Sequence, residues 1–115
     1  MLVKNALTLP MKAATHSAGK EPVRFAEAYG EQDFVGKWGC VEYVAVPAGS
    51  SIPVHRHDQD EEIYFIFEGE GILTVDGEEV RVGPGALAAC RQGGSHGLVN
   101  TSEREIRLIV VAIPI

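Results

Sequence analysis

The sequence is poor in cysteine and contains no long apolar run. Its two cysteines, Cys40 and Cys90, are far apart in the chain, so we expect buried thiols rather than a short-spaced metal or redox pair. No segment approaches the roughly 18 apolar residues of a membrane-spanning helix. The apolar stretch within residues 1–10 is too short for the core of a signal peptide. These absences predict a cytoplasmic protein without a membrane partner.

Positive charge is also scarce. The chain has 10 Lys and Arg against 16 Asp and Glu, a formal charge of -6, and its basic residues form no cluster. Binding to nucleic acid or to an anionic membrane surface requires clustered cations. We therefore expect neither kind of partner.

Glycine and proline are the residues that organise the chain. Its 115 residues fit one domain, and 13 glycines and 6 prolines separate short apolar runs. Asp76-Gly77 is a strong signal for a two-residue hairpin. This spacing is typical of a β-sandwich or barrel, with at least seven strands expected near residues 38–46, 54–57, 62–67, 72–75, 79–82, 86–90 and 105–113.

The first third of the chain is less regular. Residues 1–36 are predicted to form an N-terminal arm that packs on the barrel or on a partner subunit, and residues 37–115 to form the barrel. Within the arm, residues 25–29 fit either a short turn of helix or an edge strand. The sequence leaves both alternatives open.

Three of the four histidines form a pattern. His55 and His57 are one residue apart, so on a strand both imidazoles point to the same face. Glu62 opens the next apolar run, and His96 follows a glycine pair later in the chain. Three imidazoles and a carboxylate are suitable ligands for iron, zinc, manganese, nickel or copper. The fourth histidine, His16, is expected to be exposed and not to be a ligand.

The spacing around these residues resembles the first motif of the cupin superfamily. Gly49 is followed by five residues, then His55-Arg56-His57, four residues, Glu62, six residues and Gly69. Every fixed position of that motif is present. The count of six residues to Gly69 favours Glu62 over its neighbour Glu61 as the carboxylate ligand.

The second cupin motif is present with two departures. Gly85 is followed by five residues, then Arg91-Gln92-Gly93, two residues, His96, three residues and Asn100. Arg91 replaces the usual proline, and Ala86 replaces the aspartate that often follows the first glycine. The resemblance extends from about residue 38 to residue 113.

The resemblance implies a fold and a cofactor. The fold is an all-β jelly-roll barrel, or double-stranded β-helix, with one divalent metal ion in its mouth. The implied ligands are His55, His57, Glu62 and His96. Related small cupins are usually dimers, and the apolar last strand has an edge that needs covering, so a homodimer is expected.

Further residues are candidates for the pocket. Alternation from Glu62 places Tyr64 and Ile66 on the ligand-bearing face, and alternation from His96 does the same for Leu98. Tyr64 is either an acid–base group or a packed aromatic, and Glu61 is a second candidate catalytic residue. Arg91 either binds a substrate carboxylate or phosphate or faces solvent at the rim. Four more residues line the cavity only if their strands face inward: Trp38, Cys40, Glu42 and Cys90.

Three functions are consistent with this site. An O2-dependent oxidation by a dioxygenase is narrowly favoured. The second is a non-oxidative isomerase, cyclase or lyase, in which the ion acts as a Lewis acid and Tyr64, Glu61 or Glu42 moves a proton. The third is a small-molecule-binding module without turnover. In each case the ligand is expected to be a small oxygenated or anionic metabolite.

Overall fold

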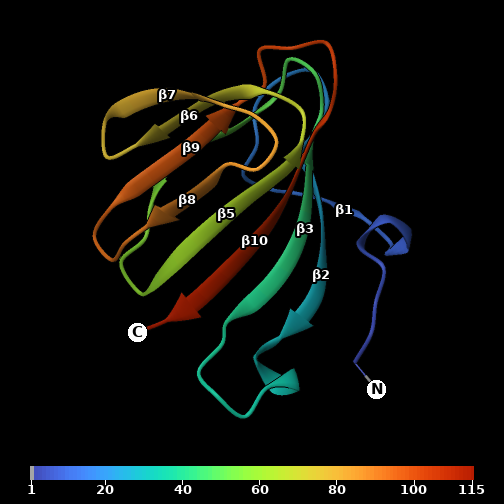
Figure 1. Ribbon diagram of the computed structural model, residues 1–115, viewed down its shortest axis with the longest axis vertical. Coiled ribbons are helices and arrows are strands. Elements are labelled where there is room, and N and C mark those ends of the chain that lie inside the picture. The colour runs from blue at the N-terminus through green and yellow to red at the C-terminus, as the bar shows by residue number, and fades with distance from the viewer. Residues whose placement is uncertain (1) are drawn as a thin grey trace.

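The computed structural model describes residues 2–115 and shows a barrel of antiparallel strands (Figure 1). Two short 3-10 turns, η1 (Ala6–Thr8) and η2 (Glu31–Asp33), lie in the first third of the chain. Within residues 2–115, no helix has the length and apolar character needed to cross a bilayer. The strands are β1 (Lys12–Ala13), β2 (Arg24–Gly30), β3 (Cys40–Val46), β4 (Ser51–Arg56), β5 (Asp60–Glu68), β6 (Gly71–Val75), β7 (Glu78–Val82), β8 (Leu87–Cys90), β9 (Ser95–Val99) and β10 (Ile106–Pro114).

The strands form two sheets that face each other. One has six strands in the order β1-β2-β3-β10-β5-β8, and the other has four in the order β4-β9-β6-β7. Most neighbours in these sheets are not consecutive in the chain, so the chain crosses repeatedly between the two layers, as in a jelly roll. The predicted all-β jelly-roll barrel is confirmed.

The strands follow from the turn residues identified in the sequence. Each predicted strand is present, with ends shifted by a few residues at most. Between β6 and β7, Val75 pairs with Glu78, which leaves Asp76 and Gly77 as a two-residue loop. Both loop residues have positive φ, 49° and 82°, as a hairpin turn of this length requires. The predicted hairpin is confirmed.

The core lies between the two sheets and is made of inward-facing side chains. On β5, Tyr64 and Ile66 are buried whereas Ile63 and Phe65 are exposed, as expected for alternate residues of a strand. Full burial of one such apolar side chain stabilises a fold by about 1.5–3 kcal/mol. The buried cluster consists of Val23, Val44, Val46, Tyr64, Ile66, Leu73, Leu98, Ile106, Leu108 and Val110.

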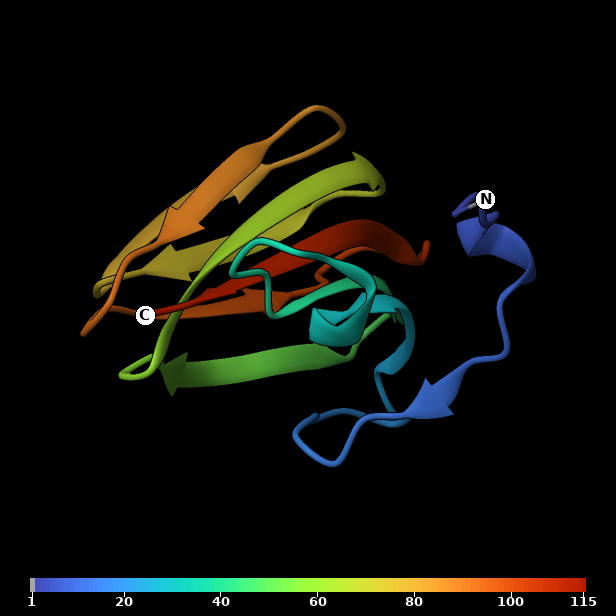
Figure 2. The ribbon, with the colours of Figure 1, turned by 90° about the horizontal axis from the view of Figure 1, so that it is seen from below.

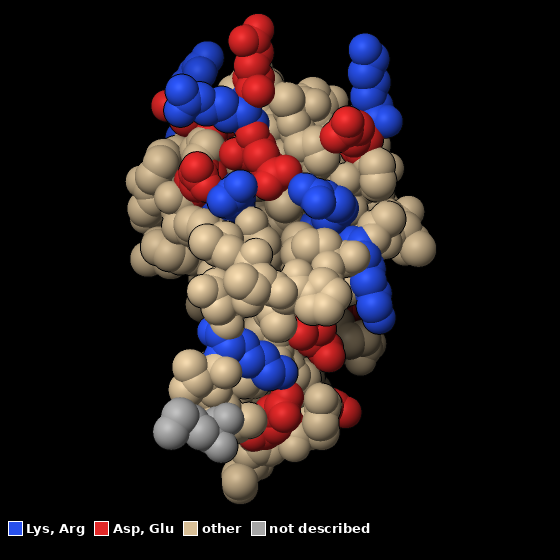
Figure 3. Space-filling model, turned by 90° about the vertical axis from the view of Figure 1, so that its right-hand side faces the viewer, with Lys and Arg blue, Asp and Glu red and all other residues tan. Residues whose placement is uncertain are grey.

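The first third of the chain is joined to the barrel. Residues 25–29 adopt the strand alternative as part of β2, which pairs with β3 on one side and with β1 on the other. Ala18 forms an isolated bridge with Ser51 at the start of β4. Figure 2 shows the segment before β1 reaching out beside the barrel, on the side away from the C-terminal end. Figure 3 shows the side that carries β1 and β2. Lys, Arg, Asp and Glu gather in an upper and a lower group, each of mixed sign, and the surface between the two groups is mostly uncharged.

Candidate metal centre

Three strands bring the four predicted ligands together. His55 lies on β4, Glu62 on β5 and His96 on β9, and His57 follows the last residue of β4. His55 and His96 are direct register partners. The backbone of His57 is held by the turn between β8 and β9, because its N–H donates to the Gly94 carbonyl at 3.0 Å. The four side chains come from distant parts of the sequence yet share one inner end of the barrel.

A glycine allows the two histidine-bearing strands to approach closely. A Cβ atom at Gly97 would lie 2.8 Å from the backbone nitrogen of Val54 on β4. Any larger residue would therefore push β9 away from β4. Because Gly97 follows His96 directly, this close approach helps to place His96 against His55.

The donor atoms converge to metal-binding distances. Nε2 of His57 lies 3.1 Å from Nε2 of His96, and these two atoms lie 3.2 Å and 3.0 Å from Oε1 of Glu62. All four residues offer a ligand atom within 4.8 Å of the others. Two donors that each bind an ion at about 2.1 Å, at a right angle, are about 3.0 Å apart. The three separations among His57, His96 and Glu62 match that value.

Two of the imidazoles are oriented by hydrogen bonds that their Nδ1 atoms, on the ring side away from the centre, donate. Nδ1 of His55 donates to the Pro53 carbonyl at 2.8 Å, and Nδ1 of His57 donates to Asp60 at 2.7 Å. Both bonds place the proton on Nδ1 and leave the Nε2 lone pair directed at the centre. Burial lowers the pKa of His55, which favours the neutral form that a metal ligand requires.

The third imidazole is held by packing. His96 is fully buried and its ring stacks on Tyr64, with centroids 4.2 Å apart. Its Nδ1 has no hydrogen-bond partner among residues 2–115. When that nitrogen carries the proton, the Nε2 lone pairs of His57 and His96 face each other with no hydrogen between them. This donor set fits a divalent cation, which would accept both lone pairs and the Glu62 carboxylate.

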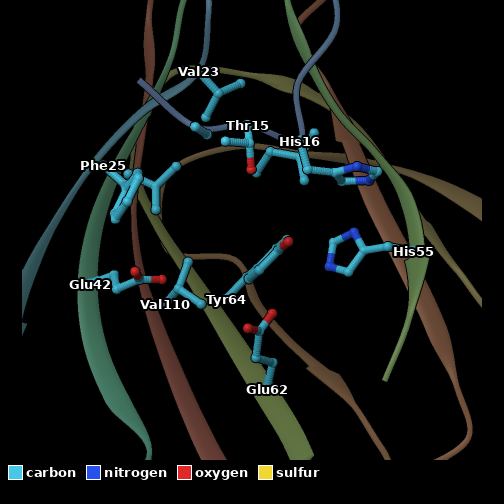
Figure 4. Close-up of a pocket in the computed structure, with 12 residues that line it drawn as sticks. Thr15, His16, Val23, Phe25, Glu42, His55, Glu62, Tyr64 and Val110 are labelled. Carbon is cyan, nitrogen blue, oxygen red and sulfur yellow. The ribbon is translucent and has the colours of Figure 1, made fainter. Parts of the chain in front are cut away.

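The centre opens into a cavity of about 450 Å³ (Figure 4). On one side the side chains of His55, His16, Glu62 and Tyr64 lie around a common space. Burial, followed by the nearby Glu62 carboxylate, raises the pKa of Tyr64 well above its usual value, so its hydroxyl stays a hydrogen-bond donor. The cavity is lined by Ala14, Thr15, His16, Val23, Phe25, Glu42, Val44, Ile52, His55, Glu62, Tyr64 and Val110.

The opposite side of the cavity is mainly apolar. Figure 4 shows Val23, Phe25 and Val110 there, with the Glu42 carboxylate among them. Val44, the register partner of Phe25 on β3, also lines the cavity. Burial raises the pKa of Glu42, and the carboxylates of Glu62 and Glu27 raise it further. No lysine or arginine lines this cavity within the described part of the chain.

Several predicted pocket residues lie elsewhere. Arg91 begins the exposed turn after β8 and lines a separate depression together with Glu61. Glu61 points away from the centre because it alternates with Glu62, and its carboxylate accepts a hydrogen bond from the Gln92 backbone at 3.0 Å. Ile66 and Leu98 face inward as expected, but they lie in the core and not in the cavity lining.

The alternatives left open for other side chains are resolved by the cavity lining. Glu42 lines the cavity, whereas Trp38, Cys40 and Cys90 do not. Cys40 precedes Glu42 on the same face of β3. Burial and then the nearby carboxylates, Glu42 first, raise the pKa of Cys40 to about 12, so it remains a thiol.

The first third of the chain contributes cavity residues that sequence reasoning did not identify. Thr15, His16, Val23 and Phe25 all line the cavity. His16 is exposed, as predicted, yet its ring lies edge-on to that of His55 with centroids 5.5 Å apart. No local spacing marks these residues, because they reach the cavity only through the pairing of β2 with β3 and the contact of Ala18 with Ser51.

Comparison with known proteins identifies relatives of this chain. Residues 42–112 match the family described as "Cupin domain". A protein of Thermotoga maritima named "Oxalate-binding protein" is 27% identical over 113 residues, which are 98% of this chain and 93% of that protein.

Solved structures resemble the whole chain. The crystal structure of a predicted oxalate decarboxylase from Thermotoga maritima is 25% identical, with a TM-score of 0.91 over 98% of this chain and 99% of that one. The polyketide cyclase RemF from Streptomyces resistomycificus is 23% identical, with a TM-score of 0.80 over 98% of this chain and 79% of that one. The second likeness shows the fold alone.

Proposed function

The chain belongs to the cupin family, and from this premise we propose that it binds a small carboxylate ligand at a divalent metal ion held by His55, His57, Glu62 and His96. The observation that carries this proposal is the 3.1 Å approach of the His57 and His96 Nε2 atoms beside the Glu62 carboxylate. Nitrogen lone pairs at this distance repel each other unless a proton or a cation lies between them. The hydrogen bond of His57 Nδ1 to Asp60 leaves its Nε2 as a lone pair, and a cation would accept this lone pair together with those of His96 and Glu62.

The carboxylate class is supported by charge and by the relatives. A divalent ion binds carboxylate and carbonyl oxygens and polarises them. Because none of the cavity residues within 2–115 is a lysine or arginine, the metal site is the place where an anionic group would be held. The relative named "Oxalate-binding protein" aligns with nearly the whole of this chain. The Tyr64 hydroxyl would donate a hydrogen bond to a ligand oxygen.

The reaction, if the ligand turns over, stays a prediction. O2-dependent oxidation remains narrowly favoured, ahead of a non-oxidative isomerisation, cyclisation or elimination. Oxygen uptake with the iron-loaded protein in the presence of a bound carboxylate would support the oxidation. Binding without product would instead support a ligand-binding module.

The proposal is tested by metal content and calorimetry. We expect close to one bound ion per chain and oxalate binding that depends on that ion, with the metal-free protein as control. His57→Ala should abolish both signals, whereas His16→Ala should keep the metal, because only His57 belongs to the donor set. Oxalate binding of equal strength without metal would overturn the proposal, as would a chain that takes up no ion.

We also propose that the protein is a homodimer. The outer face of the six-stranded sheet leaves Ile63 and Phe65 of β5 and Leu87 of β8 exposed, and Phe65 pairs directly with Leu87. Adjacent exposed apolar side chains of this kind commonly mark an interface. Light scattering should give twice the chain mass, and Phe65→Lys should give the mass of one chain. A wild-type monomer would contradict the expectation.

A further inference from the structure

The cavity beside the metal centre has two unlike sides, and the difference between them restricts the ligand. We propose that the ligand is a 2-oxo or 2-hydroxy monocarboxylate with an apolar side chain, its carboxylate end at the metal and its side chain against Val23, Phe25, Val44 and Val110. This inference rests on the proposed function and deepens it. It concerns the part of the ligand that lies away from the metal, against the apolar side of the cavity.

Volume is the first argument. The cavity of about 450 Å³ has room for far more than the metal and a bare carboxylate pair. A water molecule takes about 30 Å³ in the liquid, so a space of this size corresponds to about 15 waters. Oxalate consists of two carboxylates and nothing else, so it would leave most of the cavity filled with water. A larger ligand would displace that water.

The chemistry of the far side is the second argument. Val23, Val44 and Val110 are buried core residues, and Phe25 packs against the same cluster. The three valines have little exposed surface of their own, so the gain comes from the ligand: an apolar group that leaves water to lie against them gains roughly 25 cal/mol per Å². An aromatic or branched aliphatic side chain of a ligand would gain this energy. A polar side chain would not.

Charge is the third argument. Among the cavity residues that the structure describes, Glu42 lies on the apolar side, and none is a lysine or arginine that could bind a second anionic group. A ligand with a carboxylate at its far end would therefore meet like charge and lose its hydration without compensation. This selects one anionic end rather than two. The two adjacent oxygens that oxalate offers to an ion are also present in a 2-oxo acid, so the metal-binding end is retained.

The test compares three 2-oxo acids that share one metal-binding end. Calorimetric titration of the Mn2+-loaded protein would use pyruvate, phenylpyruvate and 2-oxoglutarate, whose side chains are a methyl group, an aromatic group and a charged group. We expect phenylpyruvate to bind about 10- to 100-fold tighter than pyruvate, and 2-oxoglutarate to bind no tighter than pyruvate. Equal affinity for all three, or tightest binding of 2-oxoglutarate, would overturn the inference.

Variants assign the preference to the apolar side. Phe25→Ala should reduce the preference for phenylpyruvate over pyruvate at least fivefold, and Phe25→Leu should restore most of it. Phe34→Ala is the matched control, because Phe34 stacks on Trp38 outside the cavity. Glu42→Gln should raise the affinity for 2-oxoglutarate several-fold. An equal loss in the Phe25 and Phe34 variants would contradict the assignment.

The failure of this inference is distinguishable from failure of the proposed function. If the protein takes up no metal, or if oxalate and pyruvate bind equally well without it, the metal-dependent site itself is wrong. If metal and oxalate bind but phenylpyruvate binds no tighter than pyruvate, only the apolar selection is wrong. Both readouts measure binding and do not depend on turnover.

Discussion

The two sides of the cavity are built in different ways. The donor side uses four side chains from β4, β5, β9 and the turn after β4, and two of the four are held by hydrogen bonds to their second nitrogen. The apolar side uses residues of β2, β3 and β10 and of the segment before β2, and its side chains are positioned by packing in the core cluster. The donor side requires atoms in one arrangement, whereas the apolar side requires only volume and hydrophobic character. The donor side can thus stay constant while the apolar side sets which ligand fits.

The largest difference between the donor side and the apolar side is expected when two metal ligands are removed. His55→Ala combined with His57→Ala should abolish stoichiometric metal binding, because half of the donor set is lost, while circular dichroism continues to show a β fold. Elemental analysis measures the metal. Phe25→Ala, a change on the apolar side, should leave stoichiometric metal binding intact. Retention of one ion per chain in the double variant would show that the donor assignment is wrong.

The next effect concerns a residue that orients a donor. Asp60→Asn should weaken metal affinity about 10- to 100-fold, because the Asp60 carboxylate accepts the Nδ1–H bond that orients His57. The control is Asp58→Asn, two residues away, whose partner is the exposed Arg56. Competition with a metal-chelating dye measures both affinities. Equal affinities in the two variants would mean that packing alone holds His57.

A smaller effect is expected on the apolar side, where Glu42 is half-buried near the carboxylates of Glu62 and Glu27. Because folding raises its pKa above the ordinary value of 4.5, the folded state favours the neutral acid. The contribution of Glu42 to stability is present below pH 4.5 and is lost as the pH rises through the raised value. Glu42→Gln should therefore raise the melting temperature of the metal-free protein by about 2–4 °C at pH 8.

This gain should vanish near pH 4, where both side chains are uncharged. Thermal melts across pH 4–8 measure the difference between wild type and variant. Glu79→Gln is the control, because Glu79 is exposed on β7 outside the cavity and does not act on the pKa of Glu42. A gain of equal size at every pH would show that ionisation of Glu42 is not its cause.

The smallest effect on ligand affinity is expected for Arg91, which lies outside the cavity. Arg91 lines a separate depression with Glu61, Asp76 and Gln92, so Arg91→Ala should change carboxylate affinity less than about twofold at unchanged metal content. Calorimetry with oxalate measures the change. A tenfold loss would support the sequence-based prediction that this guanidinium binds the ligand.

The donor side was open to prediction because its signals are local. Alternation placed His55 and His57 on one face, and the spacing to Gly69 favoured Glu62 over Glu61, which points the other way. The hairpin at Asp76-Gly77 and most strand positions followed from turn residues in the same manner. Arg91 illustrates the limit, since its distance along the chain from His96 does not show that it lies on an exposed turn.

By itself, the sequence determined the strand and turn pattern, the family and the four converging donors, because alternation and turn chemistry act over a few residues. Only the tertiary structure decided which residues face those donors. His16 and Phe25 enter the cavity because β2 pairs with β3 and residue 18 pairs with residue 51, contacts between segments far apart in the chain. Such contacts form where apolar surface is buried, and burial has no short-range spacing that a sequence displays.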